Sequence, residues 1–473
     1  MSDAQATSGG RNEPRTFEKT RTSETVLQRI TALRAPRKLM GLELSLLLFA
    51  LAVGVAAIVI IDLTVTGHLS AELLPMGIAF AASLLGLHFT IRKLAPDADP
   101  LIMPIATFLN VLGVAMIYRI SFDDPLYQEP RGDAGRQLLW STIAVVAAIV
   151  VLWTVRKHMV LFRYTYLTGL SALLLLLLPM LPGIGQNING ARVWIHIGSF
   201  SFQPGEIAKI LLAVFFAGYL VRNRDALAMV GKKILGIRFP RARDLGPLLV
   251  FWLVAMAVLV FQRDLGTSLL YFGLFLSMLY LATGRIGWLI LGVGLFLVGG
   301  IAASQTLDYV GKRFANWLDP FADPHGASFQ MVQGLFGMAN GGMTGTGFGQ
   351  GYPRVTPLSF SDYIIPSIGE ELGLIGLFVV LAAYLLLVSR GLRIGFAGQD
   401  DFGKLLAAGL SFTIAFQVFI VVGGVTRVIP LTGLTAPFLA AGGSSLVSNW
   451  IIIALLILLS NSVRNRPKLV IRS

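Results

Sequence analysis

Long apolar stretches recur along this chain, and they restrict it to one class of fold. A helix rises about 1.5 Å per residue, so about 20 apolar residues cross the roughly 30 Å hydrocarbon core of a bilayer. Because the stretches are continuous and not alternating, they exclude a transmembrane β-barrel. The sequence predicts an all-α, polytopic membrane protein of about 12 transmembrane helices, near 42–64, 73–92, 101–120, 137–155, 160–181, 207–221, 246–262, 265–282, 285–303, 370–389, 404–424 and 444–462.

One of these boundaries depends on a single charged pair. Residues 246–282 form an almost unbroken apolar run, interrupted only by Arg263 and Asp264. A helix of about 37 residues is too long for one crossing of the bilayer. We therefore expect two helices that turn at this pair.

The composition agrees with a membrane protein and excludes several other classes. Of 473 residues, 55% are hydrophobic and 13% are charged, whereas soluble domains carry about 25% charged residues. The net charge of +13 is expected to lie in cytoplasmic loops and against anionic lipid head groups, and not to bind nucleic acid. The chain has no cysteine, and its five scattered histidines form no pair at helical spacing, which argues against a zinc or haem enzyme.

Basic residues fall in every second loop and so predict the topology. Both termini are expected in the cytoplasm, as a disordered basic tail over 1–40 and a short tail over 466–473. Loops 121–136, 182–206, 304–369 and 425–443 are then outside. The longest, 304–369, is rich in glycine, proline and aromatic residues, and its stretch 329–336 predicts a short amphipathic helix.

Charged residues near the predicted outer ends of two helices suggest chemistry. Glu206 and Lys209 follow Pro204 and lie on one helical face, which fits either an ion pair or an anion site made by Lys209 with Arg192. Asp264 lies between two apolar spans, where an ionisable residue is a functional candidate, although a plain pair with Arg263 is the alternative.

Two further outward segments allow both a functional and a purely structural interpretation. The glycines between 341 and 349 follow Asp319 and Asp323, and their N–H groups could hold a phosphate or simply form turns. Asp362 precedes Glu370 and Glu371 at a helix start, where acidic residues also favour the helix dipole.

The order of these motifs resembles the SEDS family, which includes RodA and FtsW. The motifs are Gly190-Ala191-x-x-Trp194 with Gln203-Pro204-x-Glu206-x-x-Lys209, Asp264-x-Gly266-Thr267, Asp319-Pro320-x-x-Asp323-Pro324, Glu370-Glu371-Leu372-Gly373 and Pro437-Phe438-x-x-x-Gly442-Gly443-Ser444-Ser445. The resemblance covers about 101–465. Since the family typically has ten spans, 41–100 is interpreted as two additional N-terminal helices. Residues 401–404 and 430–435 resemble the RodA-like proteins of actinobacteria.

The resemblance implies a peptidoglycan glycosyltransferase that polymerises lipid II at the outer face of the bacterial cytoplasmic membrane and releases undecaprenyl diphosphate. A class B penicillin-binding protein is the implied partner, and elongation is favoured over an FtsW-type role in division. A lipid II flippase and a noncatalytic scaffold are the rival classes. Charges clustered at the outer mouth, away from the midplane, and the lack of obvious inverted repeats weigh against a flippase.

The resemblance also implies residue roles. Asp264 matches the family's catalytic aspartate. Substrate binding is expected from Arg192, Gln203, Glu206, Lys209, Gln262, Thr267, Asp319, Asp323, Gln330, Asp362 and Ser444. Cationic side chains would neutralise the departing diphosphate, with a divalent cation, magnesium or manganese, as an open alternative. Arg263 stands where the family usually has proline, and this extra cation is expected to lower the pKa of Asp264.

Overall fold

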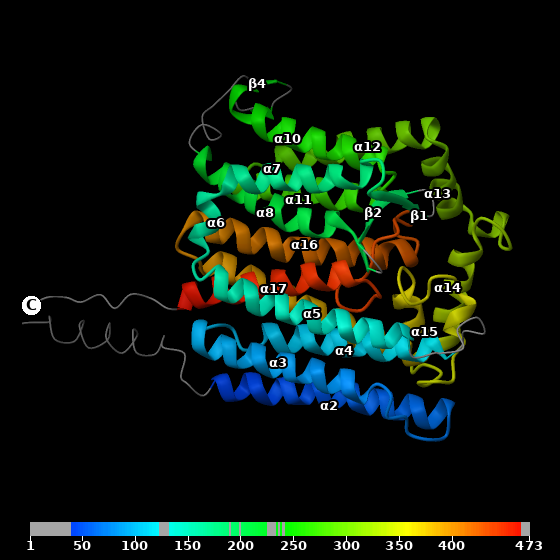
Figure 1. The fold of residues 1–473 in the computed structure, drawn as a ribbon. Helices are drawn as coiled ribbons and strands as arrows, with labels where there is room; N and C mark the ends of the chain where they lie inside the picture. Colours follow the sequence, from blue (N-terminus) through cyan, green and yellow to red (C-terminus); the bar gives the residue numbers. More distant parts are fainter. Residues whose placement is uncertain are drawn as a thin grey trace, which may run out of the picture.

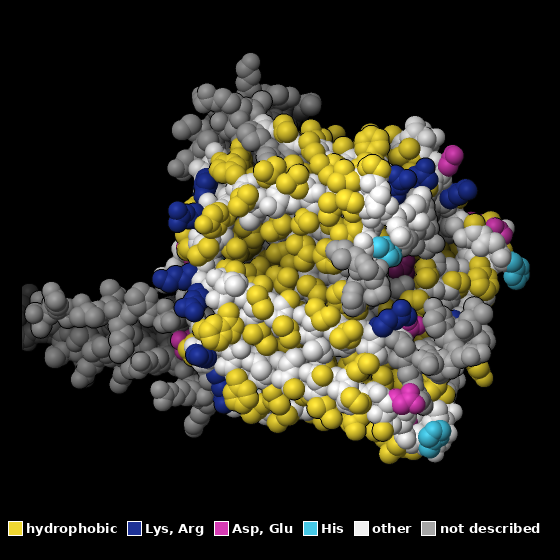
Figure 2. Space-filling model, viewed as in Figure 1, with side chains coloured by type: hydrophobic (Ala, Val, Ile, Leu, Met, Phe, Trp, Pro, Cys, Tyr) yellow, Lys and Arg dark blue, Asp and Glu magenta, His cyan; other side chains and the backbone are white. Residues whose placement is uncertain are grey.

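The structure is a bundle of long helices. The computed structural model describes residues 39–122, 132–188, 191–197, 200–224, 233–234, 237–238 and 242–464. Within these residues, ten helices are long and apolar enough to cross a membrane. Helix α2 begins and α17 ends at the same end of the bundle (Figure 1). Figure 2 shows hydrophobic side chains over the middle of one face. Lys and Arg side chains line that same end and also occur at the opposite end, where most of the acidic and His side chains of this view lie.

The elements follow the predicted apolar stretches along the chain. The first half contains α2 (Leu39–Val65), α3 (Leu74–Leu94), α4 (Ile102–Ser121), α5 (Gly132–Thr154), α6 (Met159–Arg163), α7 (Thr165–Leu177), η1 (Leu178–Met180), β1 (Gly185–Ile188), β2 (Ala191–Ile197), β3 (Phe200–Phe202), α8 (Pro204–Arg222), β4 (Lys233–Ile234) and β5 (Ile237–Arg238). The second half contains α10 (Ala242–Phe261), α11 (Leu265–Thr283), α12 (Gly287–Thr306), α13 (Asp308–Leu318), η2 (Pro320–Ala322), α14 (Phe329–Gly341), η3 (Pro353–Val355), α15 (Ile364–Ala397), α16 (Asp401–Val425) and α17 (Gly443–Arg464).

Each of the twelve predicted spans contains a helix. The division at Arg263 and Asp264 is confirmed, because α10 ends at Phe261 and α11 begins at Leu265. Two boundaries differ from the prediction. Helix α7 has only 13 residues, and α15 runs for 34 residues with a break at Gly373, whose φ of +66° suits glycine. The predicted tails over 1–40 and 466–473 lie outside the described residues, apart from the first two residues of α2.

The two N-terminal helices are fixed to the rest by buried polar contacts. Helix α2 packs on α4, and α3 packs on α5. The hydroxyl of Tyr118 on α4 donates to the Asp62 carboxylate on α2 at 2.6 Å. A buried pair of Glu43 and His88, 2.7 Å apart, joins α2 to α3. Because an unpaired polar group inside an apolar bundle is costly, these contacts specify how α2 and α3 dock.

The outer segments contain structure that the sequence did not reveal. The expected loop 182–206 forms an antiparallel sheet of order β1-β2-β3, with Ile195 of β2 opposite both Gly185 of β1 and Phe202 of β3. The expected loop 304–369 carries α13, η2, α14 and η3, so the predicted short helix at 329–336 is confirmed within α14.

Candidate active site

Asp264 caps the start of α11. Its Oδ1 accepts the backbone N–H of Thr267 at 2.9 Å, and its carbonyl oxygen accepts the hydroxyl of Ser268 at 2.6 Å. The preceding residue, Arg263, has a φ of +60°, a left-handed conformation that is unusual outside glycine. The chain therefore reverses sharply here, and the turn fixes the direction of the Asp264 side chain.

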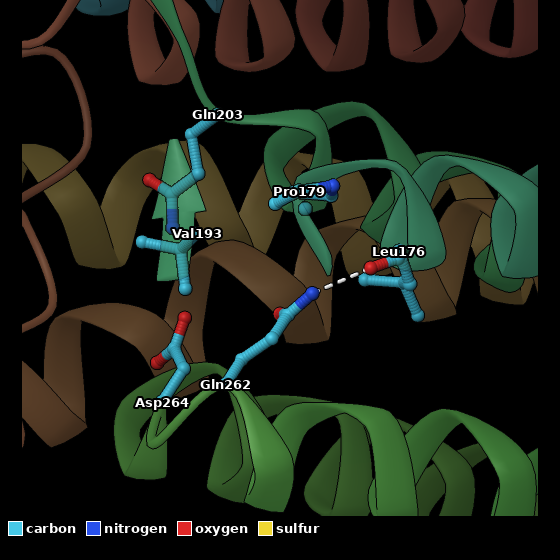
Figure 3. A pocket seen from close by; sticks show the side chains of 7 residues that line it. Leu176, Pro179, Val193, Gln203, Gln262 and Asp264 are labelled. Carbon is cyan, nitrogen blue, oxygen red and sulfur yellow. Dashed lines mark hydrogen bonds between the residues drawn. The ribbon is translucent and has the colours of Figure 1, made fainter. Parts of the chain in front are cut away.

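A narrow pocket with almost no free volume lies in front of this carboxylate. It is lined by Leu176, Pro179, Val193, Gln203, Gly205, Gln262 and Asp264. Figure 3 shows the Asp264 carboxylate pointing toward Val193, with Gln262 beside it and Gln203 beyond Val193. The Gln262 side chain is held by a hydrogen bond from its Nε2 to the carbonyl oxygen of Leu176. The structure thus brings together three predicted site residues from β3–α8 and the α10–α11 turn.

Glu206 and Lys209 form a buried ion pair on α8. Lys209 Nζ lies 2.5 Å from Glu206 Oε2 and 3.1 Å from Gln417 Oε1 on α16. The Ser448 hydroxyl on α17 donates to the same Glu206 oxygen at 2.8 Å. Lys209 is only 2% exposed. The ion-pair alternative is therefore the correct one, and direct contact between Lys209 and a diphosphate does not fit this geometry.

Ser444 connects the last helix to the same site. It lies in the first turn of α17, and its hydroxyl accepts the backbone N–H of Gln203 at 2.9 Å. Gln203 in turn precedes α8 and lines the pocket. Ser444 thus fixes the start of α8, on which Glu206 lies.

A second carboxylate, Asp362, lies close enough to Asp264 that the charge of Arg313 acts on both. Arg313 on α13 donates to the carbonyl oxygens of Leu431 and Thr432, at 3.0 and 2.7 Å. Residues 431–434 pack against Gly266, which follows Asp264 in the turn. The same segment lies next to Asp362, because a side-chain carbon at Gly433 would come within 3.6 Å of the Asp362 carboxylate. Arg313 thereby holds the segment that joins the two aspartates.

The pKa of each aspartate is raised mainly by burial. For Asp362, burial raises the pKa to about 7, opposed by the positive charge of Arg313 and reinforced by Asp264. Burial likewise raises the pKa of Asp264, while hydrogen bonds from Thr267 and the charge of Arg313 oppose it and Glu206 adds to it. A carboxylate whose pKa is raised toward neutral pH is a stronger general base.

The expectation that Arg263 lowers the pKa of Asp264 is wrong. Its guanidinium lies over the ring of Tyr309 on α13, 5.6 Å from the ring centroid. Among the described residues, Arg263 forms no ion pair with Asp264, so the structural alternative of a paired turn does not hold either. The positive-φ turn separates the two neighbouring side chains.

Arg192 lies beside the pocket but on the other face of its strand. Side chains alternate along β2, and Val193 is the residue that lines the pocket. The Arg192 side chain is exposed, and its backbone N–H donates to the carbonyl oxygen of Gln262 at 3.2 Å. The backbone contact joins the sheet to the Asp264 turn, and the side chain remains accessible.

Three other predicted residues have local structural partners. Asp319 accepts the N–H of Phe321, and Asp323 accepts the N–H of Ala327. Gln330 donates to the carbonyl oxygen of Pro357 at 2.9 Å. None of the three lines the pocket in front of Asp264.

The glycine cluster forms turns that support α15. The N–H groups of Thr346 and Gly347 donate to the carbonyl oxygens of Glu370 and Glu371, which the break at Gly373 leaves available. The Glu371 carboxylate accepts the N–H of Gly349 and pairs with Arg119 at 2.7 Å. These N–H groups are already used within the fold, so the phosphate-cradle interpretation is wrong for them.

The donor set does not fit a resident metal ion. Within the described part of the chain, no three His, Asp or Glu side chains group closely enough to hold one.

The sequence did not identify the partners that complete this site. Arg313, Gln417 and Ser448 come from three different helices and reach Asp264 and Glu206 only through the tertiary fold. Arg313 lies six residues before Asp319 and outside the motif that begins there, so the motif does not indicate its role.

Comparison with known proteins identifies the family. The model of the family described as "Cell cycle protein" (FtsW, RodA and SpoVE) matches residues 100–465. The peptidoglycan glycosyltransferase RodA of Mycobacterium tuberculosis is 44% identical over 427 residues, which cover 90% of this chain and 91% of the relative. That of Mycobacterium leprae is 43% identical over 89% and 90% of the two chains. The chain belongs to the FtsW, RodA and SpoVE family.

Solved structures show the same fold. The rod-shape-determining protein RodA of Thermus thermophilus aligns with a TM-score of 0.56 at 23% identity, covering 78% of this chain and 98% of its own. A chain of a peptidoglycan synthase complex aligns with a TM-score of 0.58 at 24% identity, covering 81% and 98%. The protein is therefore a multi-pass membrane protein of this fold.

Proposed function

We propose that the chain is a peptidoglycan glycosyltransferase of the elongation type, which polymerises lipid II into glycan strands. The mycobacterial relatives named peptidoglycan glycosyltransferase RodA share 43–44% of its residues across nine tenths of its length. The observation that carries the mechanism is the Asp264 carboxylate, which faces a pocket without an ionic partner among the described residues.

In the proposed reaction, Asp264 is the general base. The 4-hydroxyl oxygen of the acceptor sugar attacks C1 of the donor sugar, and its proton passes to the Asp264 carboxylate. The bond between C1 and the diphosphate oxygen breaks, and undecaprenyl diphosphate leaves with the electron pair. Thr267 holds the carboxylate in position by its backbone N–H. Positioned bases of this kind typically contribute about 10²–10⁴-fold in rate.

The departing diphosphate needs positive charge. We assign this role to the exposed cations beside the pocket, Arg263 and Arg192, because Lys209 is buried and already paired. The Glu206–Lys209 pair instead positions the start of α8 against α16 and α17. Gln203 and Gln262 line the pocket and are the proposed contacts to sugar hydroxyl groups.

The lipid tail requires access from the bilayer. Figure 2 shows the hydrophobic face hollowed between α7 and α5, which suits an apolar chain entering sideways. We place both termini in the cytoplasm of a bacterium, since the basic end of the bundle is where α2 begins and α17 ends. The site then faces outward, where a class B penicillin-binding protein would crosslink the product.

A flippase is the rival function for the same fold. A flippase would transport lipid II between the two leaflets without making glycan strands. A noncatalytic scaffold would do neither. The test is to incubate the purified full chain with lipid II and to separate the products by size. We expect glycan strands from the wild type and at least about 100-fold slower strand formation by Asp264→Asn. Transport by the wild type without strand formation would reject the polymerase.

A further inference from the structure

A second pocket lies at the opposite end of the bundle from Asp264. It lies between the ends of α8, α11 and α15 and the start of α16, and its volume is about 330 Å³. Helix α11 begins beside Asp264 and ends beside this pocket, so the length of a membrane-spanning helix separates the two sites. The proposed polymerase reaction makes no use of it.

Two cations in this pocket share one carboxylate. Arg224 Nη1 lies 2.6 Å from Asp401 Oδ2, and Lys404 Nζ lies 3.5 Å from Asp401 Oδ1. Arginine has five N–H donors and lysine has three, so most of their donors are not used by Asp401. The three groups together carry a net charge of +1, and the pocket therefore favours an anion.

The remaining wall of the pocket is apolar, and two of its side chains face outward. It includes Leu220, Val221, Leu281, Ala282 and Phe396. Phe396 is 82% exposed and Leu281 is 43% exposed. In a bundle that spans a membrane, such side chains at the end of a helix meet lipid, and a basic pocket beside them suits a phosphate head group. A soluble anion would use the cations but not the apolar wall.

We propose that this pocket binds the phosphate head group of an anionic phospholipid, with Arg224 and Lys404 contacting the phosphate and an acyl chain lying along Leu281 and Phe396. The proposal uses the apolar wall and the charge together. It does not depend on the catalytic role of Asp264.

The test compares lipid retention by matched variants of the purified full chain. The protein is exchanged into nanodiscs of phosphatidylglycerol and phosphatidylcholine, and retained lipid is counted by native mass spectrometry. Lys404→Gln and Arg224→Gln remove one charge each, and Ala282→Phe fills the pocket without changing charge. Lys157→Gln, an exposed cation in the turn before α6, is the control. Thermal unfolding of each variant checks that it is folded.

We expect each charge variant to lower the preference for phosphatidylglycerol by about fivefold, since a cation near a lipid surface contributes about one kcal/mol. Ala282→Phe should lower retention of the same lipid, and Lys157→Gln should not. If the three pocket variants, correctly folded, prefer phosphatidylglycerol over phosphatidylcholine as strongly as the wild type and Lys157→Gln do, the proposal is overturned. Displacement of the lipid by millimolar inorganic phosphate alone would overturn the lipid assignment in favour of a soluble anion.

Discussion

Asp264 and Asp99 precede helices at opposite ends of the same bundle, and their surroundings differ. Asp99 is 4% exposed and contacts two cations, Arg390 at 2.7 Å and Arg464 at 3.0 Å. It also accepts the N–H of Leu101 just before α4. Asp264 accepts the N–H of Thr267 just before α11 and is partly exposed to a pocket, with no cation within ion-pair distance among the described residues.

The difference separates a structural carboxylate from a reactive one. The two cations at Asp99 fix the ends of α15 and α17, so its charge is fully satisfied by the fold. The hydrogen bond from Thr267 orients the Asp264 carboxylate, but no cation pairs with it among the described residues, so its charge is not neutralised. An oriented, incompletely compensated carboxylate in a pocket is what general base catalysis requires.

The same contrast appears in the pKa directions of another pair. A hydrogen bond from His158 lowers the pKa of Asp400 at the inner end, whereas burial raises the pKa of Asp362 at the outer end to about 7. Asp400 is thus stabilised as an anion, whereas Asp362 is held closer to its neutral form. The following variants test whether this division holds.

Breaking the buried pair on α8 should have the largest effect on stability. Lys209→Ala leaves the Glu206 carboxylate buried without its ammonium partner, which typically costs about 3–5 kcal/mol. We expect a lower unfolding temperature and less folded protein. The double variant Glu206→Gln with Lys209→Met should recover much of the loss. A Lys209→Ala protein that unfolds like the wild type but no longer turns over would point instead to direct substrate contact.

Removing Arg313 should shift the pH dependence of turnover. Its positive charge lowers the pKa of both Asp264 and Asp362, so Arg313→Gln raises both. A base must be deprotonated, and the acid limb of the pH–rate profile should therefore move toward alkaline pH. Arg313→Lys keeps the charge and should restore the position of the profile. If the pH–rate profile of Arg313→Gln does not shift, Arg313 has no electrostatic effect on the catalytic carboxylate.

Asp362→Asn should change how stability depends on pH. Because its pKa is raised to about 7 in the fold, the wild type is most stable when this group is protonated, and it loses stability as pH rises from 4 through 7. The variant lacks this loss and should gain about 2–3 kcal/mol relative to the wild type between pH 5 and pH 8. Chemical unfolding at the two pH values measures it. Parallel curves for the two proteins would show that Asp362 is fully solvated.

The smallest effect is expected at the inner end. His158→Gln removes the hydrogen bond that lowers the pKa of Asp400, but the Asp400 side chain is 39% exposed and the N-cap bond from Gly403 remains. The expected cost is about 0.5 kcal/mol at neutral pH. The wild-type advantage should vanish as pH falls through the lowered pKa of Asp400. A loss of several kcal/mol would mean that the inner pairs contribute more than exposure suggests.

The helices could be predicted from sequence because each apolar stretch has the length that a bilayer requires. Asp264 could also be identified, since a charge between two apolar spans is expensive to place. Arg313 could not be assigned, because its contacts with Leu431 and Thr432 join segments more than 110 residues apart. The outer sheet was missed because its strands, of three to seven residues, are too short to give a clear alternating pattern.

The anion-binding role expected for Lys209 does not fit its buried, paired geometry, and the sequence could not show this for a related reason. A cation three residues after a glutamate fits both an ion pair and an anion site, and only burial distinguishes them. Burial depends on Gln417 and Ser448, which lie on helices that local sequence does not place. The glycine cluster was ambiguous in the same way until the break at Gly373 supplied the carbonyl oxygens that its N–H groups bind.

The central claim is that Asp264 is reactive and Asp99 is structural, and one side-by-side measurement tests it. Asp264→Asn and Asp99→Asn are purified, and the unfolding temperature and the rate of lipid II polymerisation per folded molecule are measured for each. We predict that Asp264→Asn unfolds like the wild type and loses about 10²–10⁴-fold in rate. Asp99→Asn should unfold earlier and polymerise normally. Polymerisation by Asp264→Asn near the wild-type rate, or equal loss of rate in both variants, would contradict the account.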